Sequence, residues 1–179
     1  MTVKKMNVLA FTVTGAERLD PVRVMIENIE PGKGLLTIAC FGESWNSYWG
    51  GMGGGTVQAF IKRVSNDYLI GCLDRQLNST VGDDNDANLQ FVRAEIIKQR
   101  REGEIHALEA REMWDEADSA DDVKSHCCDH NIGNALLNLF GHDEPWHAPW
   151  PSVPNPKYQY LDRIINAVRY GLRELEEAQ

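Results

Sequence analysis

The sequence lacks the long apolar run and the disulfide framework that mark membrane-spanning and small secreted proteins. No apolar stretch approaches the roughly 20 residues that a membrane-spanning helix needs, and the short apolar run after Lys5 is read as a strand rather than a signal peptide. There are only four cysteines, and two of them, Cys127 and Cys128, are sequence neighbours that pair poorly. We therefore expect free thiols and a cytoplasmic location.

Basic residues are also scarce. The chain has 18 Lys and Arg against 27 Asp and Glu, a net charge of −9, which argues against direct binding to nucleic acid. The acids gather between residues 83 and 122. Such a run is usually a solvated helix face, but it also suits a protein that imitates the phosphate backbone and attracts a basic partner. The candidate contacts of that kind are Glu109, Glu112, Asp115 and Glu116.

Catalytic motifs are missing as well. Ser44 has no Gly-x-Ser-x-Gly setting, and there is no His-Glu-x-x-His or Cys-x-x-Cys. His126 and His130 are spaced i, i+4, so on a helix over 119–130 they would share a face and could bind zinc. Further ligands would come from His142, Asp143, Glu144 and His147. We expect no cofactor and no catalysis, with a metal-dependent hydrolase centred on His126 and His130, holding zinc or another transition metal, as the alternative.

What the sequence does contain is a clear change of hydrophobic period. Apolar residues alternate with a period of two over 8–13, 22–28 and 35–41, and Pro31 with Gly32 between the last two indicates a hairpin. Spacings of i, i+3, i+4 then predict helices near 57–64, 68–73, 87–101, 107–117 and 161–175. The pattern predicts one α+β domain over 1–179, with an antiparallel sheet of about three strands and short helices in 1–77. A helical region over 87–179 packs against the sheet and contains a proline- and tryptophan-rich loop at 141–156, expected to lie over the last helix.

The segment from Trp45 to Gly55 is the most unusual part of the sequence, because three large aromatics precede five glycines within six residues. One interpretation is a strand-to-helix crossover with its tryptophans in the core. Another is a contact surface, since aromatic residues and Met anchor interfaces. A third is an anion cradle, because glycine lets the backbone approach a ligand. The candidate partner contacts are Trp45, Tyr48, Trp49 and Met52, and the candidate ligand-binding residues are Gly51, Gly53 and Gly54.

Residues 10–75 also resemble small accessory proteins of lambda-like phages and enterobacterial prophages. The resemblance rests on the runs Arg18-Leu19-Asp20-Pro21-Val22, Glu30-Pro31-Gly32-Lys33-Gly34 and Trp45 to Gly53. It implies no catalytic residue. It does imply a bacterial host cell and a genomic setting in which such proteins often bind and disable a host factor, including restriction and CRISPR systems.

Together these observations favour a non-catalytic protein that contacts a bacterial protein, with no direct nucleic-acid or membrane partner. A small nucleotide-binding sponge built on Gly50–Gly55 is a further alternative. The apolar stripe from Leu161 to Leu175 fits either core packing or the seam of a homodimer.

Overall fold

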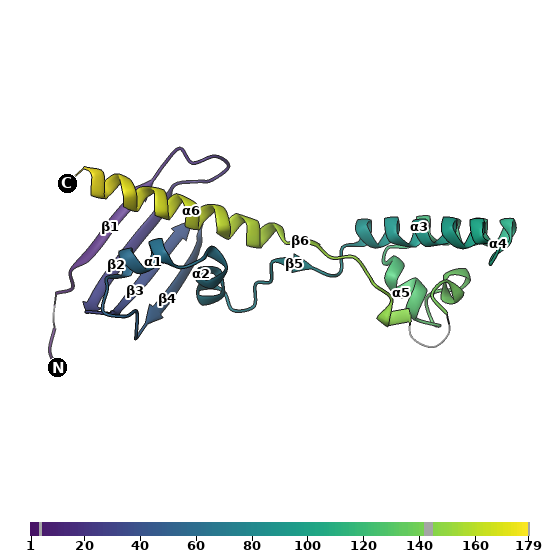
Figure 1. Ribbon diagram of the computed structural model, residues 1–179, viewed down its shortest axis with the longest axis horizontal. Helices are drawn as coiled ribbons and strands as arrows, with labels where there is room; N and C mark the ends of the chain where they lie inside the picture. The colour runs from purple at the N-terminus through teal and green to yellow at the C-terminus, as the bar shows by residue number, and fades with distance from the viewer. Residues whose placement is uncertain (4, 142–144, 179) are drawn as a thin grey trace. The chain divides into compact units, whose positions relative to one another are not determined.

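The computed structural model describes residues 1–3, 5–141 and 145–178, and it confirms the predicted α+β class. A four-stranded antiparallel sheet lies at the N-terminal end and packs against helices (Figure 1). The strands are neighbours in chain order, β1-β2-β3-β4. Their bounds are β1 Val8–Val13, β2 Val22–Glu30, β3 Lys33–Cys40 and β4 Glu43–Trp49.

The sheet has one strand more than the expected three. β4 occupies the first half of the aromatic segment, where Trp45, Ser47 and Trp49 are less exposed than the residues between them. Aromatic residues favour strands, and the two-residue turn at Phe41 and Gly42 joins β4 tightly to β3. The sequence pattern did not reveal this strand because its inward positions include a serine, which weakens the apolar alternation.

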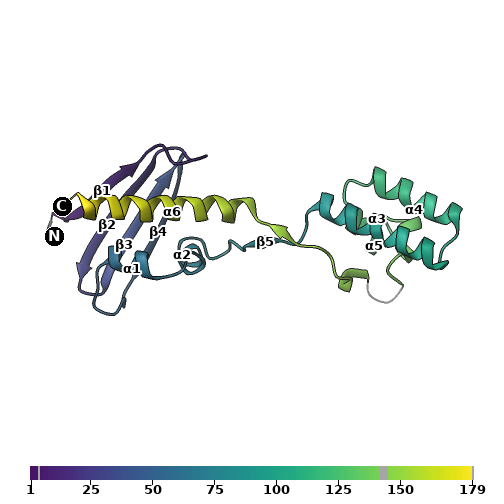
Figure 2. The same cartoon turned by 45° about the horizontal axis from the view of Figure 1, so that its top comes forward.

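Three helices cover one face of the sheet. They are α1 (Val57–Arg63), α2 (Asn66–Leu73) and α6 (Pro156–Glu177), and α6 crosses the strands in both Figure 1 and Figure 2. Thr56 caps α1, accepting a hydrogen bond from the Ala59 amide. The core between sheet and helices is aliphatic, with Val24, Ile38 and Ile164 fully buried.

The apolar stripe of α6 belongs to this core. Leu161, Ile165, Val168 and Leu172 are each at most 2% exposed, so the stripe is not a dimer seam. Gly171 lies directly over β1: a Cβ there would be 2.7 Å from the side chains of Phe11 and Val13. The absence of a side chain at Gly171 therefore allows the helix to approach β1 closely at this point.

Residues 80–154 form a second compact unit with its own core, which includes Val92, Met113, Val123 and Leu136. Its elements are β5 (Thr80–Val81), α3 (Asn85–Glu102), α4 (Ala107–Ser119), α5 (Val123–Cys128), β6 (Val153–Pro154) and the short 3₁₀ helices η1 (Ala135–Asn138) and η2 (Pro145–His147). Gly103 ends α3 in the left-handed conformation, as its position predicts.

The first unit consists of residues 1–79 and 155–179. A single domain over 1–179 stays a prediction, but the expected subdivision into 1–77 and 87–179 differs from the observed units, because α6 returns to the sheet. The proline- and tryptophan-rich loop differs too. Its Trp150 packs on Phe91 and Phe140 within the second unit rather than acting as a strap on α6.

Among the described residues, no helix combines the length and the apolar character needed to cross a membrane.

Candidate functional site

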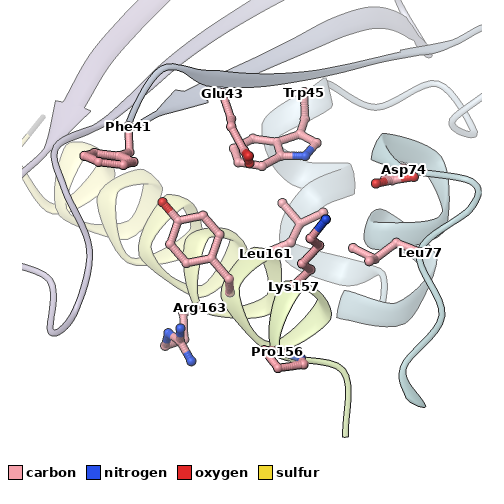
Figure 3. Close-up of a pocket in the computed structure, with 10 residues that line it drawn as sticks. Phe41, Glu43, Trp45, Asp74, Leu77, Pro156, Lys157, Leu161 and Arg163 are labelled. Carbon is pink, nitrogen blue, oxygen red and sulfur yellow. The ribbon is translucent and has the colours of Figure 1, made fainter. Parts of the chain in front are cut away.

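The first unit carries a groove of about 490 Å³ between β4, the end of α2 and the first half of α6. In Figure 3, Phe41 and Trp45 lie along the strand side, while Lys157 and Leu161 project from the helix. The lining residues are Phe41, Glu43, Trp45, Asp74, Leu77, Pro156, Lys157, Tyr160, Leu161 and Arg163. This mixture of aromatic rings and charges of both signs suits a protein or peptide surface.

Phe41 stands at the rim of the groove and is 78% exposed. It and Gly42 form the two-residue turn of the β3–β4 hairpin, and both have positive φ, 48° and 80°. Such a turn favours Asn-Gly, because a bulky side chain in the left-handed region is strained. Folding thus gains little from an aromatic ring at this position, although the ring is well placed to touch another molecule.

The floor of the groove is held by contacts around Tyr160. Its hydroxyl donates to the Cys40 sulfur at 3.3 Å, and its ring lies 6.4 Å from that of Trp45, centroid to centroid. The hydrogen bond to Cys40, together with burial, raises the pKa of Tyr160 to about 12. Tyr160 is therefore neutral at physiological pH, and its ring forms a wall of the groove.

Charges flank this wall. The Arg163 guanidinium lies 5.9 Å from the centre of the Tyr160 ring, and its buried Nε atom has no hydrogen-bond partner. Glu43 and Lys157 are exposed at the groove. No ion pair in the described part of the chain involves Glu43, Lys157 or Arg163, so all three charges are available to a ligand.

Two further depressions adjoin the groove. One, of about 410 Å³, shares Phe41 and Glu43 with it and continues to Asp20 and Arg23. The other, of about 510 Å³, shares Arg163 and continues along α6 to Tyr170. Each depression therefore borders the groove through shared side chains.

The predicted aromatic contacts separate into two groups. Trp49 and Met52 are 6% and 3% exposed and belong to the core, where the Trp49 ring lies 5.4 Å from that of Phe60. Tyr48 is exposed, and Trp45 is half-buried in the groove. The crossover interpretation thus describes Trp49 and Met52, while Trp45 alone among the four lines the groove.

The glycine loop is attached to the β2–β3 turn by backbone hydrogen bonds. Gly32 donates to the Gly55 carbonyl at 2.9 Å and accepts from the Met52 amide at 2.8 Å. Of the three glycines predicted to bind a ligand, Gly51, Gly53 and Gly54, Gly54 lines a depression together with the acidic Glu30. The first amide of α1, that of Val57, is taken by the Asn28 side chain. The loop therefore offers a poor cradle for an anion.

The histidine pair does not share a helix face, because α5 ends at Cys128 and Asp129 is extended. His126 faces Glu116, its Nδ1 atom 3.1 Å from the carboxylate, whereas His130 is exposed beyond the helix. Among the described residues no group of three or more His, Cys, Asp or Glu is placed to hold a metal ion. His147 lies in η2, and His142, Asp143 and Glu144 lie outside the described residues.

The acidic candidates on α4 differ from one another in role. Glu109 accepts a weak bond from the His106 amide at the start of the helix. Glu116 is half-buried and accepts bonds from the Asn134 and Ala135 amides, which makes it a structural residue. Glu112 and Asp115 are exposed, and Asp115 pairs with Arg111 one turn earlier. Only part of the predicted acidic face is thus open to a partner.

Sequence reasoning missed Phe41, Tyr160 and Arg163. The pattern places Phe41 at the end of the predicted strand 35–41, because the next strand, β4, is not apparent from it and so no turn is expected there. Tyr160 and Arg163 gave no signal, because they are ordinary members of an amphipathic helix and only the fold brings them to β4.

A family model of phage proteins matches residues 1–174, nearly the whole chain. No curated protein and no solved structure matches this chain.

Proposed function

The chain belongs to a phage protein family, and from this premise we propose that it is a non-catalytic binding protein that contacts a bacterial host protein through the groove at Phe41. The lambda-like and enterobacterial setting inferred from residues 10–75 is part of the same proposal. A phage gene is expressed inside a bacterial cell, where host proteins are available as partners.

The observation that carries the proposal is the exposed ring of Phe41 in a strained turn. A left-handed backbone costs a non-glycine residue on the order of 1 kcal/mol, and an exposed side chain gains no burial energy in return. Partner binding supplies the missing burial, since a fully buried phenylalanine is worth about 1.5–3 kcal/mol. The groove beside it adds Trp45 and a ring of charges, the composition typical of an interface anchor and its rim.

The sharpest test replaces Phe41 with asparagine. The turn then reads Asn-Gly, the pair most favoured in two-residue hairpins, so the Phe41→Asn variant should be as stable as the wild type or up to about 1 kcal/mol more stable. Its ability to retain a bacterial protein from host lysate should nevertheless be lost. Thermal unfolding and quantitative affinity capture measure the two effects separately.

Trp146→Ala is the matched control, since this ring is also exposed but lies in the other unit. It should retain the same protein as the wild type. Equal capture by wild type and Phe41→Asn, or no specific capture by the wild type, would contradict the proposal.

The exposed acids of α4 favour a particular class of partner, a basic nucleic-acid-binding protein of a host defence system, of the restriction or CRISPR type. Glu112 and Asp115 would then contribute by imitating phosphates. Reversing both charges with Glu112→Lys and Asp115→Lys should slow association and remove its salt dependence. Unchanged association in low salt would exclude the acidic contribution while leaving the Phe41 groove untouched.

A further inference from the structure

The sheet has a second face, opposite the three helices, that no element of the first unit covers. Buried residues alternate with more exposed ones along β2 and β3, and the buried set, including Val24 and Ile38, faces the helices. The other set forms three rows of four across the sheet. The strand register gives the rows as Val8, Glu27, Leu35 and Tyr48; Ala10, Met25, Thr37 and Asn46; and Thr12, Arg23, Ala39 and Ser44.

This open face carries two opposite charges without a partner. Within the three rows, Arg23 and Glu27 are the charged residues, both on β2 and separated by Met25. No ion pair in the described part of the chain involves either of them, whereas Lys33, on the same side of β3 at the end of the sheet, pairs with Glu30. Val8, Met25 and Tyr48 are 37%, 45% and 58% exposed. Exposed apolar side chains beside unpaired opposite charges are typical of an interface.

The rows are complementary to one another under a two-fold rotation. The two-fold axis lies in the plane of the interface, perpendicular to the strands and at the level of Met25. The strands of the second copy then run in the opposite direction. The first row of one copy therefore faces the third row of the other, and the two middle rows face each other. Glu27 then opposes Arg23 of the second copy, and the reverse contact follows by symmetry. Leu35 and Tyr48 meet the small side chains of Ala39 and Ser44, so large residues oppose small ones across the interface.

We propose that this open sheet face binds a second copy of the same chain and forms a symmetric dimer, with two reciprocal Arg23–Glu27 ion pairs around a Met25 contact. Face-to-face sheets pack with their strands within about 30° of alignment, which the antiparallel stacking of the two β2 strands satisfies. The proposed dimer face is distinct from the Phe41 groove, which lies on the helical side of the sheet, although Arg23 also lines the depression next to that groove.

The size of the face sets the strength of the dimer. Four strands about 4.8 Å apart and five residues long give a flat footprint of roughly 300–400 Å² per copy. Even with the relief of the side chains, this is at the low end for specific interfaces. We therefore expect a dissociation constant in the micromolar range, with monomer and dimer exchanging rapidly.

Charge reversal provides the test. Sedimentation equilibrium of the wild-type protein from about 5 to about 500 µM should show a monomer–dimer equilibrium. Arg23→Glu places two acids opposite each other and Glu27→Arg places two bases opposite each other, so each variant should dimerise at least about tenfold more weakly. The double variant Arg23→Glu/Glu27→Arg restores both pairs and should dimerise as the wild type does.

A mixture of the two single variants gives the decisive result. Each of them should dimerise only weakly alone, yet their equimolar mixture should form a heterodimer, because every pair across the two-fold axis then has opposite charges. This gain of association cannot come from a folding defect. A wild type that remains monomeric at the highest concentration, or a mixture that does not associate more than either variant alone, would overturn the proposal.

Discussion

Glu116 is the side chain on which the loops of the second unit converge. Its carboxylate accepts hydrogen bonds from the Asn134 amide at 2.8 Å, from the Ala135 amide and from His126. Burial raises the pKa of Glu116, but the backbone bonds from Asn134, Ala135 and Leu136 and the bond from His126 outweigh it, and the pKa is lowered from its usual value of 4.5. The charged form is therefore the one that the fold stabilises.

Removing this carboxylate should destabilise the second unit. Glu116→Ala leaves several partly buried backbone amides without an acceptor, which costs on the order of 2 kcal/mol. Urea denaturation, monitored by the helical circular dichroism signal, measures this loss of stability. Glu112→Ala on the exposed side of the same helix is the control and should change the free energy of unfolding by less than about 0.5 kcal/mol. Equal effects of the two substitutions would contradict the structural role of Glu116.

The same residue predicts a pH dependence. The pKa of Glu116 is lower in the folded state than its value near 4.5 in the unfolded chain. The stabilisation that its charge gives the folded state is therefore fully present above the unfolded pKa, and it is lost as the pH falls through the folded pKa. Unfolding free energies of wild type and Glu116→Gln should converge as the pH falls from 6 towards 3. A constant difference over that range would show that the carboxylate charge is not involved.

At the scale of secondary-structure elements, the contact of α6 with β1 depends on a glycine. A Cβ at Gly171 would lie 2.7 Å from Phe11 and Val13, so Gly171→Ala should force the helix away from the strand and cost about 1–3 kcal/mol. Thermal unfolding of the purified variant measures the loss.

Gly71 in α2 is the matched control for this prediction. It also lies within a helix, but a Cβ there would meet nothing within 4 Å. Gly71→Ala should therefore stabilise the protein by about 0.5–1 kcal/mol through helix propensity. The two Gly→Ala substitutions should thus change the stability in opposite directions. A loss of stability in both would show that a Cβ at Gly71 does not have free space around it.

At the scale of the whole molecule, the two units have separate cores. All buried members of one core come from residues 1–79 and 155–179, and all members of the other come from 80–154. The chain leaves and re-enters the first unit at neighbouring points, because the Asn155 amide donates to the Ser79 carbonyl at 2.9 Å.

This arrangement predicts that the first unit folds without the second. Replacing residues 80–154 by a short Gly-Ser linker should leave a cooperative unfolding transition and a dispersed NMR spectrum, since no core contact of the first unit is removed. The separate 80–154 fragment, with helical circular dichroism as its readout, tests the converse. An unfolded shortened chain would show that the sheet and α6 depend on the second unit.

The α+β class, strands β1 to β3 and the helical character of α3 and α6 could be predicted from the amino-acid sequence. These follow from hydrophobic period and turn residues, which act between positions close in the chain. The three-dimensional fold was needed to show that Trp49 and Met52 are core residues, that Glu116 is a structural acceptor and that the end of α5 separates the histidine pair. The groove and the open sheet face also came from the tertiary structure, because they combine residues far apart in sequence. The return of α6 to the sheet brings Tyr160 near Phe41. Arg23 and Glu27 belong to a broad open face only because the other strands extend the sheet on both sides of β2. Local patterns carry no information about such distant contacts.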